Sequence, residues 1–210
     1  MSMVFNKELD NDCRLGMWEI EEDLDTLLSK VYLTPDEEKS VEGFQSYQRK
    51  LEWVSVRVLV NSMLDKHLTI VYDQNRKPFL HDKSFNISIS HSRNLTSILV
   101  SKNKKVGIDL EFMSHKITKI AHKFINDREI ISDDPHLRNK HLYIHWCAKE
   151  ALYKICDKQD INFKQNLCIL PFDVTDTGNI TGIVENKFGH EEFKMNYFFR
   201  NNYIVVWCNK

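Results

Sequence analysis

A stretch of seven residues near the middle of the chain, VGIDLEF at residues 106–112, has the two-residue period of a β-strand. Ile108 and Leu110 enter one face of such a strand. Asp109 and Glu111, two residues apart, project together from the other face. Two carboxylates on one face suit a hard cation such as Mg²⁺, which offsets their mutual repulsion. The alternative interpretation is a solvent-facing acidic edge.

The segments before this strand predict two more strands and two long helices. Residues 85–90 alternate in period two, a second strand is predicted at residues 97–101, and together with residues 106–112 these strands predict an antiparallel meander. Further upstream, residues 19–30 and 36–64 have the apolar periodicity of helices. The first half of the chain is therefore predicted to run from helices to strands.

The second half repeats that order. Helical periodicity covers residues 116–130 and 136–156. Period-two alternation then runs through residues 172–174, 180–183 and 193–207, with turn signals at residues 176–179 and 201–202. This coarse repetition predicts an α+β fold of two similar halves, although no residue-level repeat accompanies it.

Composition and cysteine usage describe an ordinary soluble globular chain. The 210 residues include 42% hydrophobic and 28% charged residues, with no low-complexity tract. A net charge of −1 excludes a strong electrostatic field around the whole molecule but permits a local basic patch. No CxxC pair is present, so neither a zinc cage nor a disulfide framework is predicted for the five cysteines, Cys13, Cys147, Cys156, Cys168 and Cys208.

The first residues have no apolar signal core, and no aliphatic run is long enough to cross a membrane. We therefore expect a cytoplasmic protein with reduced thiols that binds neither membrane nor nucleic acid.

Two further segments carry candidate chemistry. In WCAKEALYK, residues 146–154, Glu150 and Lys154 are neighbours on one helix face. Such a pair by itself indicates only ~0.2–0.5 kcal/mol of helix stability. His91, at the end of a predicted strand, can donate a hydrogen bond to a phosphate. A surface or capping histidine is the alternative.

The order of these segments along the chain resembles the 4′-phosphopantetheinyl transferase superfamily. A Lys77-Pro78 loop precedes SHS at residues 90–92, GIDLE at 107–111 and WCAKEALYK at 146–154. These match the family's diagnostic pair, (I/V)G(I/V)D(I/L)E and WxxKEAxxK. The resemblance extends from about Arg49 through Lys154, and it is closest to the single-chain, pseudo-dimeric type of the surfactin synthetase activator.

The resemblance implies a fold and a different function for each half of the chain. Two similar α/β halves would be related by a pseudo-twofold, each with an antiparallel sheet and packed helices. Residues 1–104 would contact the phosphates and adenine of coenzyme A. Residues 105–210 would carry the Mg²⁺-binding acids and dock the carrier protein.

The resemblance also implies the reaction. The enzyme would transfer the 4′-phosphopantetheine group of coenzyme A to a serine of an apo acyl or peptidyl carrier protein, giving the holo carrier and 3′,5′-ADP. The implied Mg²⁺ ligands are Asp109, Glu111 and Glu150. Lys154 would stabilise the developing negative charge. Glu150 is also a candidate base for the carrier serine, acting directly or through a water molecule bound to the metal, and the sequence leaves both routes open.

The implied substrate contacts form two sets. His91 would contact the 3′-phosphate of coenzyme A, with Lys77 in the adenine and phosphate loop and either Arg49 or Arg57 as the upstream cation. The complete predicted coenzyme A set is Arg49, Arg57, Lys77, Pro78, Ser90, His91, Asp109 and Lys154. The predicted carrier-docking set is Lys116, Lys119 and Lys123, for which an ordinary solvated helix face is the alternative.

Two rival functions follow from the same residues. A different Mg²⁺-dependent phosphotransferase acting on a nucleotide is disfavoured, because no GxxxxGK(S/T) loop is present. A catalytically inactive module that binds carrier proteins is disfavoured, because Asp109, Glu111, Glu150 and Lys154 are all chemically competent. We expect a monomer, and the sequence does not reveal which carrier protein it serves.

Overall fold

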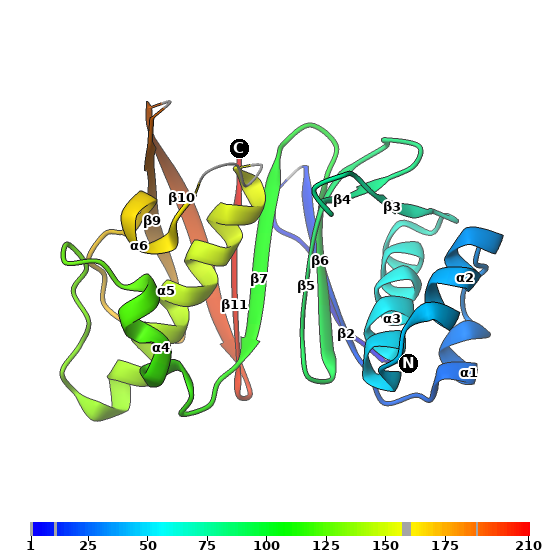
Figure 1. Cartoon of the computed structure of the whole chain (residues 1–210), viewed down its shortest axis with the longest axis horizontal. Helices are drawn as coiled ribbons and strands as arrows, with labels where there is room; N and C mark the ends of the chain where they lie inside the picture. The colour runs from blue at the N-terminus through cyan, green and yellow to red at the C-terminus, as the bar shows by residue number, and fades with distance from the viewer. Residues whose placement is uncertain (1, 11, 157–160, 188) are drawn as a thin grey trace. The chain divides into compact units, whose positions relative to one another are not determined.

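The computed structural model describes residues 2–10, 12–156, 161–187 and 189–210. The chain divides into two compact units, unit 1 (Met1–Lys104) and unit 2 (Lys105–Lys210). In each unit, helices pack on an antiparallel sheet (Figure 1). The predicted mixed α+β class, with antiparallel sheets and packed helices, is therefore confirmed.

Unit 1 contains a four-stranded antiparallel sheet in the order β1-β2-β6-β5. Its strands are β1 (Met3–Glu8), β2 (Cys13–Glu19), β5 (Asn86–Ser92) and β6 (Leu95–Ser101). A separate two-stranded ribbon pairs β3 (Ile70–Tyr72) with β4 (Pro78–Leu80). The strands predicted at residues 85–90 and 97–101 correspond to β5 and β6, whereas β1 and β2 were not predicted.

The described residues of unit 1 also form the helices α1 (Leu24–Leu28), α2 (Pro35–Gly43) and α3 (Tyr47–Leu64). The central helix α3 contacts β2 and β6 on one side and α1 and α2 on the other. Residues 53–60 are therefore all buried, and the polar side chains of Ser55 and Arg57 are buried with the apolar ones.

Both helix predictions for the first half were too long. Residues 36–64 form two helices, because Phe44 is extended and the Ser46 side chain caps a new helix by accepting from the Arg49 N–H at 3.3 Å. Residues 19–30 are helical only over α1, since Glu19 still pairs with Leu95 in the sheet.

Unit 2 contains a five-stranded antiparallel sheet in the order β7-β11-β10-β9-β8. Its strands are β7 (Val106–Phe112), β8 (Leu167–Ile169), β9 (Thr177–Asn186), β10 (Gly189–Arg200) and β11 (Tyr203–Asn209). Its helices are α4 (Ile117–Phe124), α5 (Pro135–Ile155) and α6 (Phe163–Asn166). The long helix α5 contacts β7 and β11 (Figure 1).

Several details of the second half differ from the predictions. The antiparallel meander predicted from residues 85–90, 97–101 and 106–112 was wrong in its third strand, because β7 pairs with β11 and not with β6. Residues 172–174 form no strand, and the turn predicted at residues 176–179 is mostly the start of β9. The helix predicted at residues 116–130 ends at Phe124. The predicted turn at residues 201–202 and the helix at residues 136–156 are confirmed.

The two units share a connectivity. In unit 1, β2 leads into helices and then pairs with β6, the second strand of the β5–β6 hairpin. In unit 2, β7 leads into helices and then pairs with β11, the second strand of the β10–β11 hairpin. The predicted likeness of the two halves is thus visible in their topology, whereas the pseudo-twofold stays a prediction.

The glycine of the GIDLE segment sets how closely α5 approaches the sheet. A Cβ atom at Gly107 would lie 2.2 Å from the carbonyl oxygen of Ala151 on α5. Because that neighbour is backbone, the helix itself would have to move. We expect Gly107→Ala to destabilise the chain by about 2–3 kcal/mol, measured as the free energy of unfolding in urea.

The matched control is Gly43→Ala, at the end of α2, where an added Cβ would meet nothing within 4 Å. That substitution should change the free energy of unfolding by less than about 1 kcal/mol. Equal effects of the two substitutions would contradict the close approach of α5 to β7.

Within the described residues, none of the helices combines the length and the apolar character that crossing a bilayer requires.

Candidate active site

An ion pair joins β7 to α5 in unit 2. The Lys154 Nζ donates to Asp109 Oδ1 at 2.7 Å and to the Ile108 carbonyl oxygen at 2.8 Å. The side chains are 21% exposed for Lys154 and 7% exposed for Asp109. Two residues separated by 45 positions in sequence are therefore in direct contact on the strand and helix that carry the GIDLE and WCAKEALYK segments.

Both strand acids lie near the middle of α5. Burial raises the pKa of the Cys147 thiol well above its usual value, and the charges of Asp109 and Glu111 raise it further, while Lys154 acts in the opposite direction. Cys147 is fully buried on α5, one turn before Glu150. The thiol therefore stays protonated, beside a cluster of charged groups from the strand and the helix.

The remaining acid, Glu150, is half-buried on α5, one turn before Lys154. Across the part of the chain that the structure describes, no group of three or more His, Cys, Asp and Glu side chains is placed to hold a metal ion. The donor chemistry nevertheless fits Mg²⁺, because carboxylate oxygens are its preferred protein ligands and Asp109, Glu111 and Glu150 are carboxylates. The three-acid ligand set of Asp109, Glu111 and Glu150 stays a prediction.

A second polar cluster lies in unit 1 and joins α3 to β5. The Nη1 atom of Arg49 lies 2.6 Å from His91 Nε2, and the Nδ1 atom of His91 lies 3.3 Å from the Glu52 carboxylate. Glu52 also accepts from Arg49 at 3.4 Å. The structure thus brings two predicted coenzyme A contacts, Arg49 and His91, together around an acid that the sequence analysis missed.

The structure shows different environments for Arg49 and Arg57, the two arginines that the sequence offered as alternative contacts to the 3′-phosphate. Arg57 is 1% exposed and its Nε donates to Glu37 at 2.8 Å. Its guanidinium also donates to the carbonyl oxygens of Trp53 and Ile70, both at 3.2 Å, and stacks on the Trp53 ring. Burial lowers the pKa of Arg57, while neighbouring Tyr72 and Glu37 oppose the shift. Arg57 is therefore held in the interior, and Arg49 is the arginine that contacts His91.

The other predicted coenzyme A contacts lie in two places in unit 1. Lys77 is half-buried and its backbone N–H donates to the Asp73 carboxylate at 2.8 Å, which closes the loop before β4. Pro78 begins β4. Ser90 is 6% exposed within β5, and its carbonyl oxygen accepts from the Ser97 hydroxyl at 3.3 Å.

A cavity of about 880 Å³ opens beside Arg49 in unit 1. Its walls include the cations Arg49, Arg57 and Arg76, the rings of Phe44, Trp53, Tyr72 and His81, and the acids Asp36 and Glu37. Rings and cations in one cavity suit a phosphorylated nucleotide, since bases stack on rings and phosphates bind cations.

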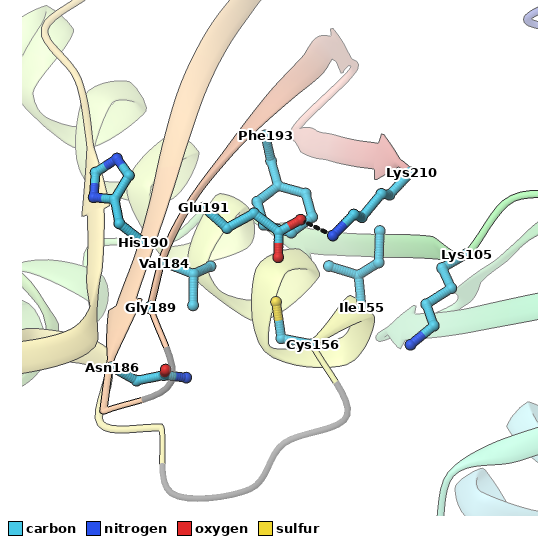
Figure 2. Close-up of a pocket in the computed structure, with 10 residues that line it drawn as sticks. All are labelled: Lys105, Ile155, Cys156, Val184, Asn186, Gly189, His190, Glu191, Phe193 and Lys210. Atoms are coloured by element: carbon cyan, nitrogen blue, oxygen red, sulfur yellow. Dashed lines mark ion pairs between the residues drawn. The ribbon is translucent and has the colours of Figure 1, made fainter.

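Another cavity, of about 470 Å³, lies in unit 2 at the end of α5 and contains none of the predicted site residues among its described lining (Figure 2). Figure 2 shows Lys210 paired with Glu191, and Cys156 among the other residues that line the cavity. This cavity is distinct from the Asp109–Lys154 pair.

The predicted docking lysines are all exposed on or beside α4. Lys119 and Lys123 lie on the helix, and Lys116 immediately precedes it. The opposite face of α4 is anchored by Ile117 and Phe124, which are buried. The amphipathic character of this helix is therefore confirmed, whereas docking stays a prediction.

Comparison with known proteins bears on unit 2. Residues 105–208 match the family model described as the 4′-phosphopantetheinyl transferase superfamily, which is just under half of the chain and nearly all of that unit. The chain is similar to the 4′-phosphopantetheinyl transferase HetI of Nostoc sp. (strain PCC 7120 / SAG 25.82 / UTEX 2576), at 25% identity over 138 residues.

That alignment covers 58% of this chain and 58% of the relative's length. The superfamily resemblance is thus confirmed for the segment that holds Asp109, Glu111, Glu150 and Lys154, and the pseudo-dimeric subtype stays a prediction.

Proposed function

We propose that this chain is an Mg²⁺-dependent enzyme that transfers 4′-phosphopantetheine from coenzyme A to a serine of an apo acyl or peptidyl carrier protein. The observation that carries the proposal is the contact between Asp109 and Lys154, at 2.7 Å, inside the segment that matches the superfamily. Action as a cytoplasmic monomer is part of the same proposal.

In this reaction the serine Oγ attacks the phosphorus on the pantetheine side of the diphosphate. The phosphoanhydride bond breaks, the electron pair leaves with 3′,5′-ADP, and the serine proton is released. Asp109, Glu111 and Glu150 would hold Mg²⁺, which when bound neutralises charge on the diphosphate.

The chain's own side chains have two further roles. Lys154 is 21% exposed, so its ammonium can reach a bound phosphate while the contact with Asp109 keeps it in position. A positive charge in such a partly desolvated position stabilises the negative charge that develops as the leaving group departs. Glu150, one helical turn away, takes the serine proton directly or through a water molecule.

Unit 1 would supply the contacts to the other end of coenzyme A. Arg49 and His91 form a pair of nitrogen groups suited to the 3′-phosphate, and the cavity beside Arg49 offers rings for the adenine. Lys77, Pro78 and Ser90 belong to the same proposed set. Arg57 also lines that cavity, but its guanidinium already donates to Glu37 and to two carbonyl oxygens, so we propose Arg49 as the arginine at the 3′-phosphate.

The experiment that tests the proposal is incubation of the chain with coenzyme A, Mg²⁺ and a panel of apo carrier proteins, followed by intact-mass spectrometry. Carriers from fatty-acid, polyketide and peptide synthesis should be compared side by side. We expect at least one to gain the mass of a single phosphopantetheine group. Chelation of the metal should prevent the gain, and a carrier whose acceptor serine is replaced by alanine should show none.

The inactive carrier-binding module is the second candidate, and the same experiment separates it from the enzyme. Carriers that bind the chain but gain no mass, across the whole panel, would favour the binding module.

We propose that Lys116, Lys119 and Lys123 attract the acidic surface of the carrier protein. Lys119→Glu combined with Lys123→Glu should lower kcat/KM for the carrier about tenfold, because reversed charge slows the encounter. Steady-state kinetics with varied carrier should show this loss, while calorimetry should show unchanged affinity for coenzyme A.

The matched control is Lys164→Glu combined with Lys194→Glu, at two exposed positions elsewhere in unit 2. These changes reverse the same number of charges and should leave kcat/KM nearly unchanged. Equal losses in both double variants would reject α4 as the docking surface.

A further inference from the structure

The Glu52 carboxylate of α3 lies against the imidazole ring of His91 on β5. Its side chain is 12% exposed, and Oε2 lies 3.3 Å from His91 Nδ1 and 3.4 Å from Arg49 Nη1. Its other oxygen accepts from Gln48 Nε2 at 3.4 Å, and Gln48 also donates to the Arg93 carbonyl oxygen at 2.8 Å. The carboxylate is thus held on the helix and directed at the imidazole ring.

These contacts define the protonation state of the His91 ring. An arginine side chain can only donate hydrogen bonds, so at 2.6 Å from Arg49 the Nε2 atom of His91 must accept. A neutral imidazole with an accepting Nε2 carries its proton on Nδ1, where it faces the Glu52 carboxylate at 3.3 Å. Without a ligand, the cluster therefore consists of one cation, one anion and one neutral ring.

A bound phosphate would change this arrangement. The phosphate attracts the guanidinium of Arg49 and requires donors, and His91 Nε2 becomes a donor only when it takes up a proton. A carboxylate beside Nδ1 favours the charged imidazolium, because it stabilises the ring in its doubly protonated form. Glu52 is the group placed to do this.

We propose that Glu52 is a positioning residue that orients His91 and stabilises it as an imidazolium, so that binding of the 3′-phosphate of coenzyme A takes up one proton. This inference rests on the proposed function, which supplies coenzyme A as the ligand. The contact between Arg49 and His91 Nε2 is given up, two hydrogen bonds form from Arg49 and from Nε2–H of His91 to phosphate oxygens, and Nδ1–H stays against the Glu52 carboxylate.

The charges around the ring explain why the proton arrives with the ligand. On α3, Arg49 and Glu52 are charged groups that face His91. In the turn after β5 the charged residue is Arg93, and the residue opposite His91 on β6 is the uncharged Thr96. The adjacent guanidinium disfavours a second cation until a phosphate dianion is bound.

The test is calorimetry of coenzyme A binding to the full chain at pH 8, in two buffers with different ionisation enthalpies. At this pH the phosphate is already doubly ionised, since its second pKa is about 6. The difference in observed binding enthalpy between the two buffers, divided by the difference in their ionisation enthalpies, then gives the number of protons taken up on binding. We expect close to one proton with coenzyme A and close to none with 3′-dephospho-coenzyme A.

Glu52→Gln separates a structural role from an electrostatic one. The amide oxygen of glutamine can still accept from Nδ1–H, so the ring keeps its orientation but loses the neighbouring negative charge. We expect at least half of the proton uptake to be lost and the affinity for coenzyme A to fall about tenfold, with no change for 3′-dephospho-coenzyme A. The matched control, Glu42→Gln at an exposed position of α2, should behave as the unmodified chain.

His91→Gln, at an exposed position, should lose the same proton uptake, and it keeps the test decisive if Glu52→Gln loses its fold. Proton uptake that is unchanged in Glu52→Gln or in His91→Gln would overturn the inference and leave the proposed function intact. Failure of coenzyme A to bind the unmodified chain at all would instead overturn the proposed function.

Discussion

Replacement of Asp109 by asparagine is expected to slow phosphopantetheine transfer about a thousandfold while the chain stays folded. The carboxylate is one of the proposed Mg²⁺ ligands, and it holds the Lys154 ammonium at 2.7 Å. Asparagine keeps the volume of the 7% exposed side chain, so no cavity forms, whereas alanine would leave one. The loss of rate therefore reports the loss of charge.

The rate should be measured by intact mass of the carrier over time, with a thermal melt to establish the fold. The control is Glu185→Gln on β9, which removes an exposed carboxylate that pairs with Arg128 at 3.1 Å. That variant should transfer at nearly the normal rate. Normal turnover in the Asp109 variant would refute its assignment to the site.

The largest expected loss of stability comes from Lys149, the lysine before Glu150 in the WCAKEALYK segment. Its side chain is fully buried, and its Nζ donates to Glu129 at 2.8 Å, to the Phe163 carbonyl oxygen at 3.2 Å and to the Phe124 carbonyl oxygen. Burial lowers the pKa of Lys149, and the neighbouring Glu129 opposes that shift. Lys149→Met should destabilise the chain by about 3–5 kcal/mol, because it leaves the Glu129 carboxylate buried without its cation.

The contacts of Glu129 with backbone amides predict the stability of a double variant that lacks both Lys149 and Glu129. The carboxylate also accepts from the backbone N–H groups of Asn126 at 2.9 Å and Ile169 at 2.8 Å. Replacing Lys149 by Met and Glu129 by Leu together should therefore not restore stability, because these amides and the two carbonyl oxygens would lose their partners.

Urea unfolding gives the free energies for both variants. Lys140→Met provides the control on the same helix, since Lys140 is half-exposed and lies 3.7 Å from an exposed Asp176. It should cost less than about 1 kcal/mol. If Lys149→Met lowered the free energy of unfolding as little as this control, the buried Lys149–Glu129 pair would contribute little to stability.

Alternation made β7 predictable from the sequence, whereas the lack of alternation left β2 unpredicted. The bounds of β7 match the prediction because its acids and aliphatic residues alternate. In contrast, β2 is buried along most of its length, so Leu15, Met17 and Trp18 show no alternation of polar and apolar residues. The pairing of β7 with β11 depends on contacts nearly a hundred positions apart, which local periodicity does not contain.

The sequence indicated candidate site residues, but it did not indicate the contacts between them. The GIDLE segment indicated Asp109, but the contact with Lys154 depends on how closely α5 packs over Gly107. Local sequence also does not distinguish Arg57, which is buried, from Arg49, which contacts His91. Glu52 was missed because an acid three residues after an arginine is indistinguishable from an ordinary helix ion pair.

The central claim is that the acids of β7 and the Glu150–Lys154 pair of α5 surround one metal-bound diphosphate. Its most direct test is a crystal structure of the chain with coenzyme A and Mn²⁺ in place of Mg²⁺, with anomalous scattering to locate the metal. We predict a manganese ion at ligand distance from Asp109, in contact with the diphosphate of coenzyme A. Coenzyme A bound with its diphosphate away from Asp109 and Lys154, or manganese bound only elsewhere, would contradict the account.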